Sequence, residues 1–208
     1  MNLRRNRPGT KAADLWNWEQ EDIANMTGPF AAQEYLQELI RNDPSNIVKI
    51  CEPPKEVDES VWQYEHIRQF ILELNLLVVQ LQGICTNKVC PKMKATDEWL
   101  YLCASHKSPQ ECSAIDYMIH SLDHSTAIVH NTKNFNSRVS IPQSGTKLLL
   151  SIVRRLYRLF THTYFHHKEI FTEFESEMHL CARFTEFANR FKMMSSDLFI
   201  IPAEALQI

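Results

Sequence analysis

The sequence predicts a mainly α, single-domain helical bundle that carries one small irregular or β-hairpin insert. Two observations favour helices: apolar residues recur near a period of 3.6 in several long segments, and only 4 of the 208 residues are glycine. A third observation defines the insert, because cysteines and prolines interrupt residues 85–112. With 44% apolar and 23% charged residues, the chain can form a core and is not disordered as a whole.

The N-terminal part predicts an arm, a first helix and a loop. Residues 1–11 are basic and lack apolar periodicity, which favours a flexible N-terminal arm. We expect the helical domain over residues 12–202 and a C-terminal tail over 203–208. A first helix is predicted over 30–41, where apolar residues have helical spacing. Pro44, Pro53 and Pro54 then predict a surface loop.

The clearest predicted helix begins near Ser60. Ser60 and Gln63 have the spacing of a capping box. Gly83 is a natural C-terminal stop. Between them runs an apolar stripe of helical period, made of Ile67, Phe70, Ile71, Leu74, Leu77, Val78 and Leu81. We therefore expect this helix at the centre of the core.

Three further helices are predicted after the insert. Within the insert, residues 99–102 could form a strand or a hairpin. Ser113 and Asp116 open a helix that extends through Ile128. A long helix is expected over about 144–162 and an amphipathic one over about 172–191.

The interpretation of the six cysteines depends on the expected cellular compartment. The first thirty residues contain no apolar segment of the secretory type, and no apolar run is long enough to span a bilayer. We therefore expect a cytoplasmic protein without a transmembrane segment, peripheral to internal membranes only through its partners. A reducing compartment disfavours structural disulfides, so the cysteines are interpreted as metal ligands or as buried thiols.

A Cys-x4-Cys pair and a histidine cluster form the candidate metal site. Cys85 and Cys90 follow the helix stop at a spacing typical of zinc sites, and His162, His166 and His167 offer imidazoles. Two of each would close a tetrahedral site; the alternative is two buried thiols and surface histidines. On an unbroken helix, residues four apart lie about 40° from each other and residues five apart about 140°. Geometry alone therefore selects His162 with His166, and His167 requires a helix break.

A second candidate group contains Cys103, His106 and Cys112. It lacks a convincing fourth ligand. We therefore interpret its cysteines as core thiols and its histidine as a surface imidazole.

Charge is segregated along the chain although the formal net charge is only −3. Residues 12–40 contain six acidic and no basic side chains, whereas residues 124–168 contain seven basic and no acidic ones. A dipolar surface of this kind steers charged partners, unless the two blocks pair within the fold. Nothing in the balance favours a nucleic-acid binder. Within the basic block, Arg154, Arg155 and Arg158 share one non-core arc of the predicted long helix. From the charges alone this arc is either an ordinary solvated helix face or a site for a phosphate group.

Several of these motifs together resemble the MOB family of kinase-binding adaptors. The family signature is carried by Cys85-x4-Cys90-Pro91-x-Met93, by residues 154–162 and by Tyr164-Phe165-His166-His167. Residues 3–11, 112–117 and 137–141 resemble the phocein subgroup. The resemblance extends from Leu3 to about Pro202.

The resemblance implies a helical bundle with one structural Zn²⁺ held by Cys85, Cys90, His162 and His167. That ligand pattern requires the long helix to end near His162. It also implies a non-catalytic adaptor associated with striatin-family scaffolds, type 2A protein phosphatase and germinal-centre-type kinases. Matching basic positions in kinase-activating members form a phosphothreonine-peptide pocket, so we expect Arg154, Arg155 and Arg158 to bind a phosphopeptide.

Parts of the sequence allow three alternative functions to be compared with this one. One is a MOB-type co-activator that binds a kinase directly through the acidic N-terminal face. A zinc-dependent enzyme is disfavoured, because four protein ligands leave no open position and no His-Glu-x-x-His or phosphate-binding glycine motif is present. A Cys2His2 finger is disfavoured because about seventy residues separate the two ligand pairs, where a finger has about twelve.

Overall fold

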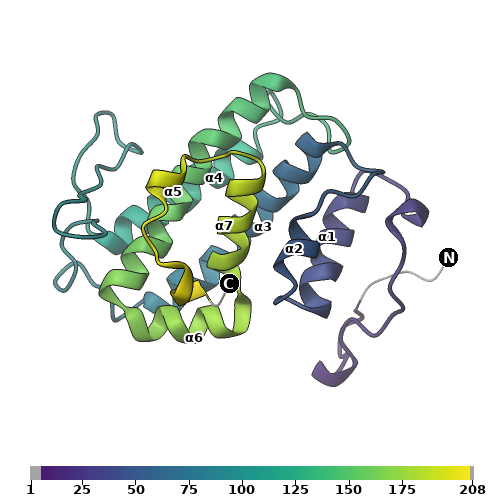
Figure 1. Cartoon of the computed structure of the whole chain (residues 1–208), viewed down its shortest axis with the longest axis horizontal. Coiled ribbons are helices and arrows are strands. Elements are labelled where there is room, and N and C mark those ends of the chain that lie inside the picture. Colours follow the sequence, from purple (N-terminus) through teal and green to yellow (C-terminus); the bar gives the residue numbers. More distant parts are fainter. Residues whose placement is uncertain (1–5, 207–208) are drawn as a thin grey trace.

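The structure is a computed structural model that describes residues 6–206 (Figure 1). Its described residues form seven α-helices, which confirms the predicted mainly α bundle. In chain order they are α1 (Ala31–Asn42), α2 (Ile47–Cys51), α3 (Glu59–Leu81), α4 (Ala114–Val129), α5 (Gln143–His166), α6 (Lys168–Met178) and α7 (Leu180–Arg190). Short 3-10 turns lie at Ala12–Asp14, Ile23–Asn25, Ser196–Leu198 and Ala203–Leu206.

Helix α3 is the centre of the core, as predicted. It packs against α1, α4, α5, α6 and α7, and every residue of the predicted apolar stripe is buried. Its start differs from the prediction, because the capping side chain belongs to Asp58, which accepts from the Ser60 backbone N–H at 2.8 Å. Its end agrees with the prediction, since Gly83 adopts a φ of 83° just beyond the last turn.

The first and fourth helices match their predicted positions. Helix α1 lies one residue from the predicted bounds, and Ser113 caps α4 by accepting from the Asp116 N–H at 3.3 Å. The predicted loop between Pro44 and Pro53 contains the short helix α2 instead. Asn46 caps this helix, and Ile50 and Cys51 are buried against α7. A local cap and burial therefore stabilise a helix too short to show periodicity.

The C-terminal helices differ from their predicted boundaries. Helix α5 runs four residues beyond His162, and the single helix predicted over 172–191 is two helices, α6 and α7. They separate at His179, which adopts the left-handed conformation with φ 47°. The Glu175 carboxylate accepts from the backbone N–H groups of Cys181 and Ala182, both at 2.7 Å, and so caps the start of α7.

The insert between α3 and α4 projects from one end of the bundle (Figure 1). Its described residues form two isolated antiparallel bridges, Lys94 with Leu100 and Cys103 with Gln110. It is therefore irregular, and the bridges do not extend into a hairpin ladder within residues 85–112.

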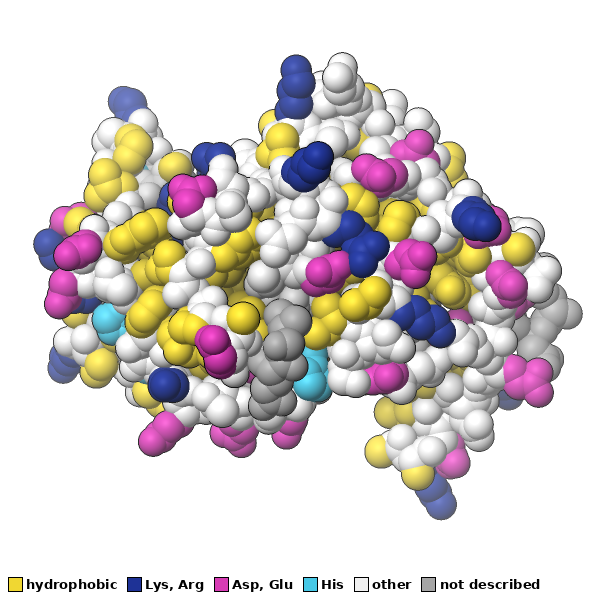
Figure 2. All heavy atoms as spheres, viewed as in Figure 1, with side chains coloured by type: hydrophobic (Ala, Val, Ile, Leu, Met, Phe, Trp, Pro, Cys, Tyr) yellow, Lys and Arg dark blue, Asp and Glu magenta, His cyan; other side chains and the backbone are white. Residues whose placement is uncertain are grey.

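One cation of the basic block, Arg138, is paired within the fold. Arg138 of the basic block contacts Glu65 of α3 and donates to Gln33 of α1 at 2.7 Å. The guanidinium of Arg41 lies 4.5 Å from the Trp16 ring, which connects the N-terminal segment to α1. Figure 2 shows basic and acidic side chains interspersed on one face. Residues 1–5 of the predicted N-terminal arm lie outside the described residues.

None of the helices in the described part of the chain is long and apolar enough to cross a bilayer.

Candidate metal centre

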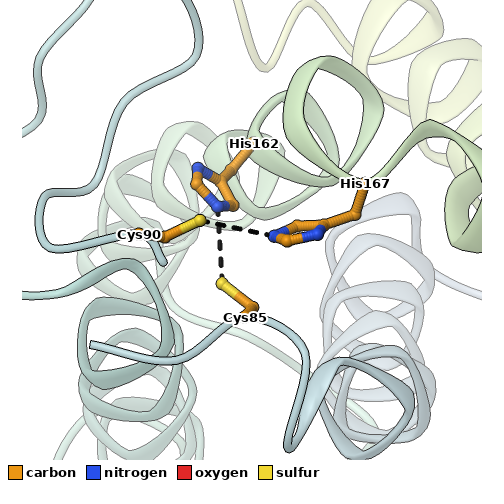
Figure 3. A group of neighbouring side chains, drawn as sticks. All are labelled: Cys85, Cys90, His162 and His167. Carbon is orange, nitrogen blue, oxygen red and sulfur yellow. Dashed lines mark hydrogen bonds between the residues drawn. The ribbon is translucent and has the colours of Figure 1, made fainter. Parts of the chain in front are cut away.

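Four side chains from two distant parts of the chain meet at the base of the insert (Figure 3). The Sγ atom of Cys85 lies 3.5 Å from Nε2 of His162, and Sγ of Cys90 lies 3.5 Å from Nε2 of His167. All four of these atoms lie within 4.8 Å of one another. The cysteines precede the histidines by 77 residues in each pair, so the cluster joins the beginning of the insert to the end of α5.

A tight turn after α3 places the two cysteines. The backbone N–H of Cys85 donates to the Leu81 carbonyl at 2.9 Å, and that of Cys90 donates to the Thr86 carbonyl at 2.8 Å. The Ala114 N–H in turn donates to the Cys90 carbonyl at 3.0 Å. The Cys-x4-Cys segment is thus held between the last turn of α3 and the first of α4.

His162 is oriented by a backbone carbonyl. Its Nδ1 lies 2.7 Å from the Lys94 oxygen, and because a carbonyl only accepts, Nδ1 carries the proton. Nε2 therefore directs its lone pair at the cysteines. This is the outer hydrogen bond that fixes the tautomer of a metal-ligating histidine.

His167, not His166, joins the cluster because the helix ends between them. Helix α5 is regular through His166, whereas His167 has φ −138° and ψ 52° and links α5 to α6. The expectation that the long helix ends near His162 is therefore wrong, since one non-helical residue is sufficient to redirect the side chain. His166 is exposed and stacks on the His162 ring at a centroid distance of 4.6 Å.

Burial affects the proton affinity of both ligand types. Burial, followed by the nearby Cys90, raises the pKa of the Cys85 thiol to about 12. Burial lowers the pKa of His162 to about 4. The imidazole is thus neutral at pH 7 and ready to donate its lone pair, whereas a thiol that binds a metal must release its proton.

The donor set fits one Zn²⁺ ion. A tetrahedron with Zn–S of about 2.3 Å and Zn–N of about 2.05 Å has sulfur–nitrogen edges of roughly 3.5 Å. The Cys85–His162 and Cys90–His167 sulfur–nitrogen distances both have this value. Two thiols and two imidazoles are also the ligands of structural zinc sites, and together they leave no position open.

The three predicted phosphate-binding arginines have different surroundings. Arg154 is exposed and lines a shallow cavity of about 560 Å³ with Lys147 and Lys192. Arg155 is half-buried near His124. The pKa of His124 is lowered mainly by burial of its ring and secondarily by the charge of Arg155.

Arg158 is held by the protein itself. It donates to the Tyr117 hydroxyl at 2.6 Å and lies 4.6 Å from the Tyr101 ring centroid. Sequence reasoning did not identify these tyrosines as its partners, because they are distant in sequence.

Comparison with known proteins supplies the family. The model of the Mob1/phocein family matches residues 18–201, which span all seven helices and all four members of the metal cluster. The chain belongs to the Mob1/phocein family. MOB kinase activator-like 4 of Drosophila melanogaster is 50% identical over 200 residues, covering 96% of this chain and 90% of the relative.

Two other family members show how identity varies. MOB-like protein phocein of Caenorhabditis elegans is 44% identical, again over 96% of this chain and 90% of the relative. The maintenance of ploidy protein mob1 of Schizosaccharomyces pombe is 26% identical over 68% of this chain and 70% of its own. The phocein-type likeness predicted from the short motifs is thereby confirmed over nearly the whole chain.

Proposed function

We propose that this Mob1/phocein family member is a non-catalytic adaptor subunit that binds protein kinases. The observation that carries the proposal is the 50% identity, over 96% of the chain, to a protein named as a MOB kinase activator. Opposite charge blocks over residues 12–40 and 124–168 are of the kind that steers charged protein partners. We place its action in the cytoplasm, with access to internal membranes only through partners.

The proposed cofactor is one structural Zn²⁺ bound by Cys85, Cys90, His162 and His167. A closed set of two sulfurs and two nitrogens leaves no coordination position for a substrate or for an activated water. The ion would fix the base of the insert against the end of α5. Its role is then to hold the binding surface in shape, and the protein itself performs no reaction.

The proposed partners are a striatin-family scaffold with its type 2A protein phosphatase and germinal-centre-type kinases. This part of the proposal rests on the phocein-type motifs of the sequence. Reconstitution tests it: the purified chain is titrated into a mixture of scaffold, phosphatase and kinase. Assembly should saturate at stoichiometric amounts of the chain. Saturation at catalytic amounts, or turnover of a substrate by the isolated chain, would contradict an adaptor role.

The arginines of α5 are proposed to receive a phosphorylated partner segment. Arg154 lines a cavity edged by two lysines, and Arg155 lies beside it in sequence. Such guanidinium groups bind phosphate through paired hydrogen bonds. Arg158 would contribute its charge from a fixed position, because its contacts with Tyr117 and Tyr101 hold it in place.

Titration calorimetry with phosphothreonine peptides from candidate kinases tests this pocket. Binding should weaken with salt, vanish on dephosphorylation and fall sharply in Arg155→Ala and Arg154→Ala. Arg190→Ala is the matched control, because Arg190 pairs with Glu186 on the surface of α7. Equal affinity for the unphosphorylated peptide would remove the pocket from the proposal and leave the adaptor role intact.

A second candidate is a co-activator that contacts a kinase directly through the acidic N-terminal region. The relatives named as kinase activators favour it, as does the acidic block over residues 12–40. Charge reversal of the exposed Asp14 and Glu34 should then abolish kinase activation and spare scaffold binding. The opposite result favours the scaffold-associated adaptor.

A further inference from the structure

A second group of two cysteines and two histidines lies in the insert, separate from the metal centre. It contains Cys103, His106, Cys112 and His120, and their sulfur and nitrogen atoms all lie within 4.8 Å of one another. The sequence suggests the first three but not the fourth. His120 lies eight residues beyond Cys112 inside α4, and only the fold brings it to the other three.

Three contacts in this group join a sulfur to an imidazole nitrogen. Nε2 of His106 lies 2.9 Å from Sγ of Cys112. Nδ1 of His120 lies 3.7 Å from Sγ of Cys103 and 3.8 Å from Sγ of Cys112. The roughly 3.5 Å edge of a tetrahedral zinc site falls within the range of these three distances.

The backbone around the group is arranged to hold it in place. Cys103 and Gln110 exchange backbone hydrogen bonds of 2.8 and 3.2 Å, which brings the two ends of the 103–112 loop together. The Cys112 carbonyl accepts from the Met93 N–H at 3.1 Å. The Ser105 hydroxyl donates to the His120 carbonyl at 3.3 Å. Cys103, Cys112 and His120 therefore each take part in a hydrogen bond that links two separate segments.

Packing does not explain why two imidazoles face two free thiols. His106, Cys112 and His120 are only partly buried, so burial in an apolar core does not explain the arrangement. The His106 and His120 rings meet edge-on at 4.9 Å, and both turn a nitrogen towards sulfur. Two thiolates and two imidazoles around one point form the donor set that selects Zn²⁺ among divalent ions of its size.

We propose that Cys103, His106, Cys112 and His120 form a second Zn²⁺ site, which fixes the 103–112 loop to helix α4. The site shares no residue with the Cys85 cluster. Three of its ligands come from the loop and one from helix α4, and all four lie within 17 residues of one another in the sequence. The site therefore organises the insert locally and does not connect distant parts of the bundle.

Metal content and intact mass measured under native conditions test the proposal. The chain purified without added metal should carry two zinc ions. His120→Ala should carry one and remain folded, whereas His124→Ala, one turn further along α4, should carry two. Cys112→Ser should behave like His120→Ala. A wild-type chain with one zinc, or a His120→Ala variant that keeps two, would overturn the proposal.

Two additional measurements distinguish the sites. Because three of the four ligands here are partly exposed, a chelator should remove one zinc quickly and the second slowly, and His120→Ala should lose the fast phase. Cobalt substitution of the fast site should give the intense thiolate charge-transfer bands of a tetrahedral Cys2His2 centre. Intact mass lower by two hydrogens, indicating a Cys103–Cys112 disulfide, would overturn the proposal whatever occupies the Cys85 cluster.

Discussion

The pKa values of single residues in this protein depend strongly on how deeply the side chains are buried. His66 on α3 is fully buried, stacks on Phe187 at 5.0 Å and donates from Nε2 to the Ile50 carbonyl at 3.1 Å. Burial, and secondarily the charge of Arg183, lower its pKa to about 3. The imidazole is therefore neutral in the folded protein at every pH well above about 3.

This neutral histidine predicts acid sensitivity. Below about pH 6.5 the unfolded chain protonates His66, whereas the folded chain does not until about pH 3. Stability conferred by the neutral form is thus lost as pH falls through this window, by up to about 1.4 kcal/mol per pH unit. Urea unfolding at pH 7 and pH 5 should show a smaller pH dependence in His66→Gln than in the wild type. The exposed His130→Gln should leave the pH dependence unchanged, and an unchanged dependence in His66→Gln would contradict the assignment.

Substitutions in the Cys85 cluster give the second residue-level prediction. Cys85→Ala and His162→Ala should yield insoluble or unfolded protein, because structural zinc contributes on the order of 10 kcal/mol in small zinc-finger peptides, comparable to the net stability of a domain. His166→Ala is the matched control, since its ring lies outside the donor set. Zinc content and circular dichroism provide the measurement. Loss of zinc in His166→Ala but not in His167→Ala would reverse the ligand choice.

The residues show where sequence reasoning reaches its limit. The cysteine spacing and the nearby histidines indicated a metal site, but helix geometry alone selected His166. The deciding fact is the backbone conformation of His167, which no residue type nearby dictates. His120 was missed for a different reason: a histidine inside an amphipathic helix has no local signal, and only the packing of the insert on α4 reveals its neighbours.

At the scale of elements, a buried ion pair is the contact best suited to make the packing of α7 on α3 specific. Glu73 of α3 pairs with Arg183 of α7, and both side chains are almost completely buried. The Arg183 guanidinium also lies 5.6 Å from the Phe70 ring centroid. Two charges removed from water in this way constrain how α7 sits on α3.

Breaking this pair should be far more costly than replacing it. Glu73→Ala leaves a buried unpaired guanidinium and should destabilise the fold by about 3–5 kcal/mol in urea unfolding. The double variant Glu73→Leu with Arg183→Leu should recover most of that loss, because it removes both charges. Glu186→Ala, which breaks an exposed pair with Arg190, should cost less than about 1 kcal/mol. If Glu73→Ala lowered the free energy of unfolding as little as that control, the result would contradict a stabilising role for the pair.

Helix centres were more predictable than helix ends. The apolar stripe of α3 identified its buried residues because burial imposes a period over many turns. The boundary between α6 and α7 was missed because His179 adopts a left-handed conformation without a glycine or proline to signal it. Asp58 rather than Ser60 caps α3 because either side chain can supply the acceptor, and only the backbone conformation decides between them.

For the whole molecule, metal removal should destabilise every helix together. Helix α3 runs through the bundle and packs on five other helices, so the cluster at its C-terminal end is coupled to α1 at the other side. Chelation should lower the melting temperature in calorimetry, and re-addition of zinc should restore it. Hydrogen exchange should then accelerate in α1 as well as in α5. Exchange that increases only around the insert would show that the bundle is stable without metal.

The sequence distance across the Cys85 cluster also has a consequence for folding order. Bringing together groups 77 residues apart costs on the order of 4 kcal/mol of chain entropy. Local contacts, such as those between consecutive helices, are formed at a lower entropic cost and are expected first. The cluster can therefore assemble only after α4 and α5 have folded back onto α3. A newly made chain would remain without this metal until residues 162–167 have been synthesised. Zinc would therefore bind late in folding and would not act as a folding nucleus.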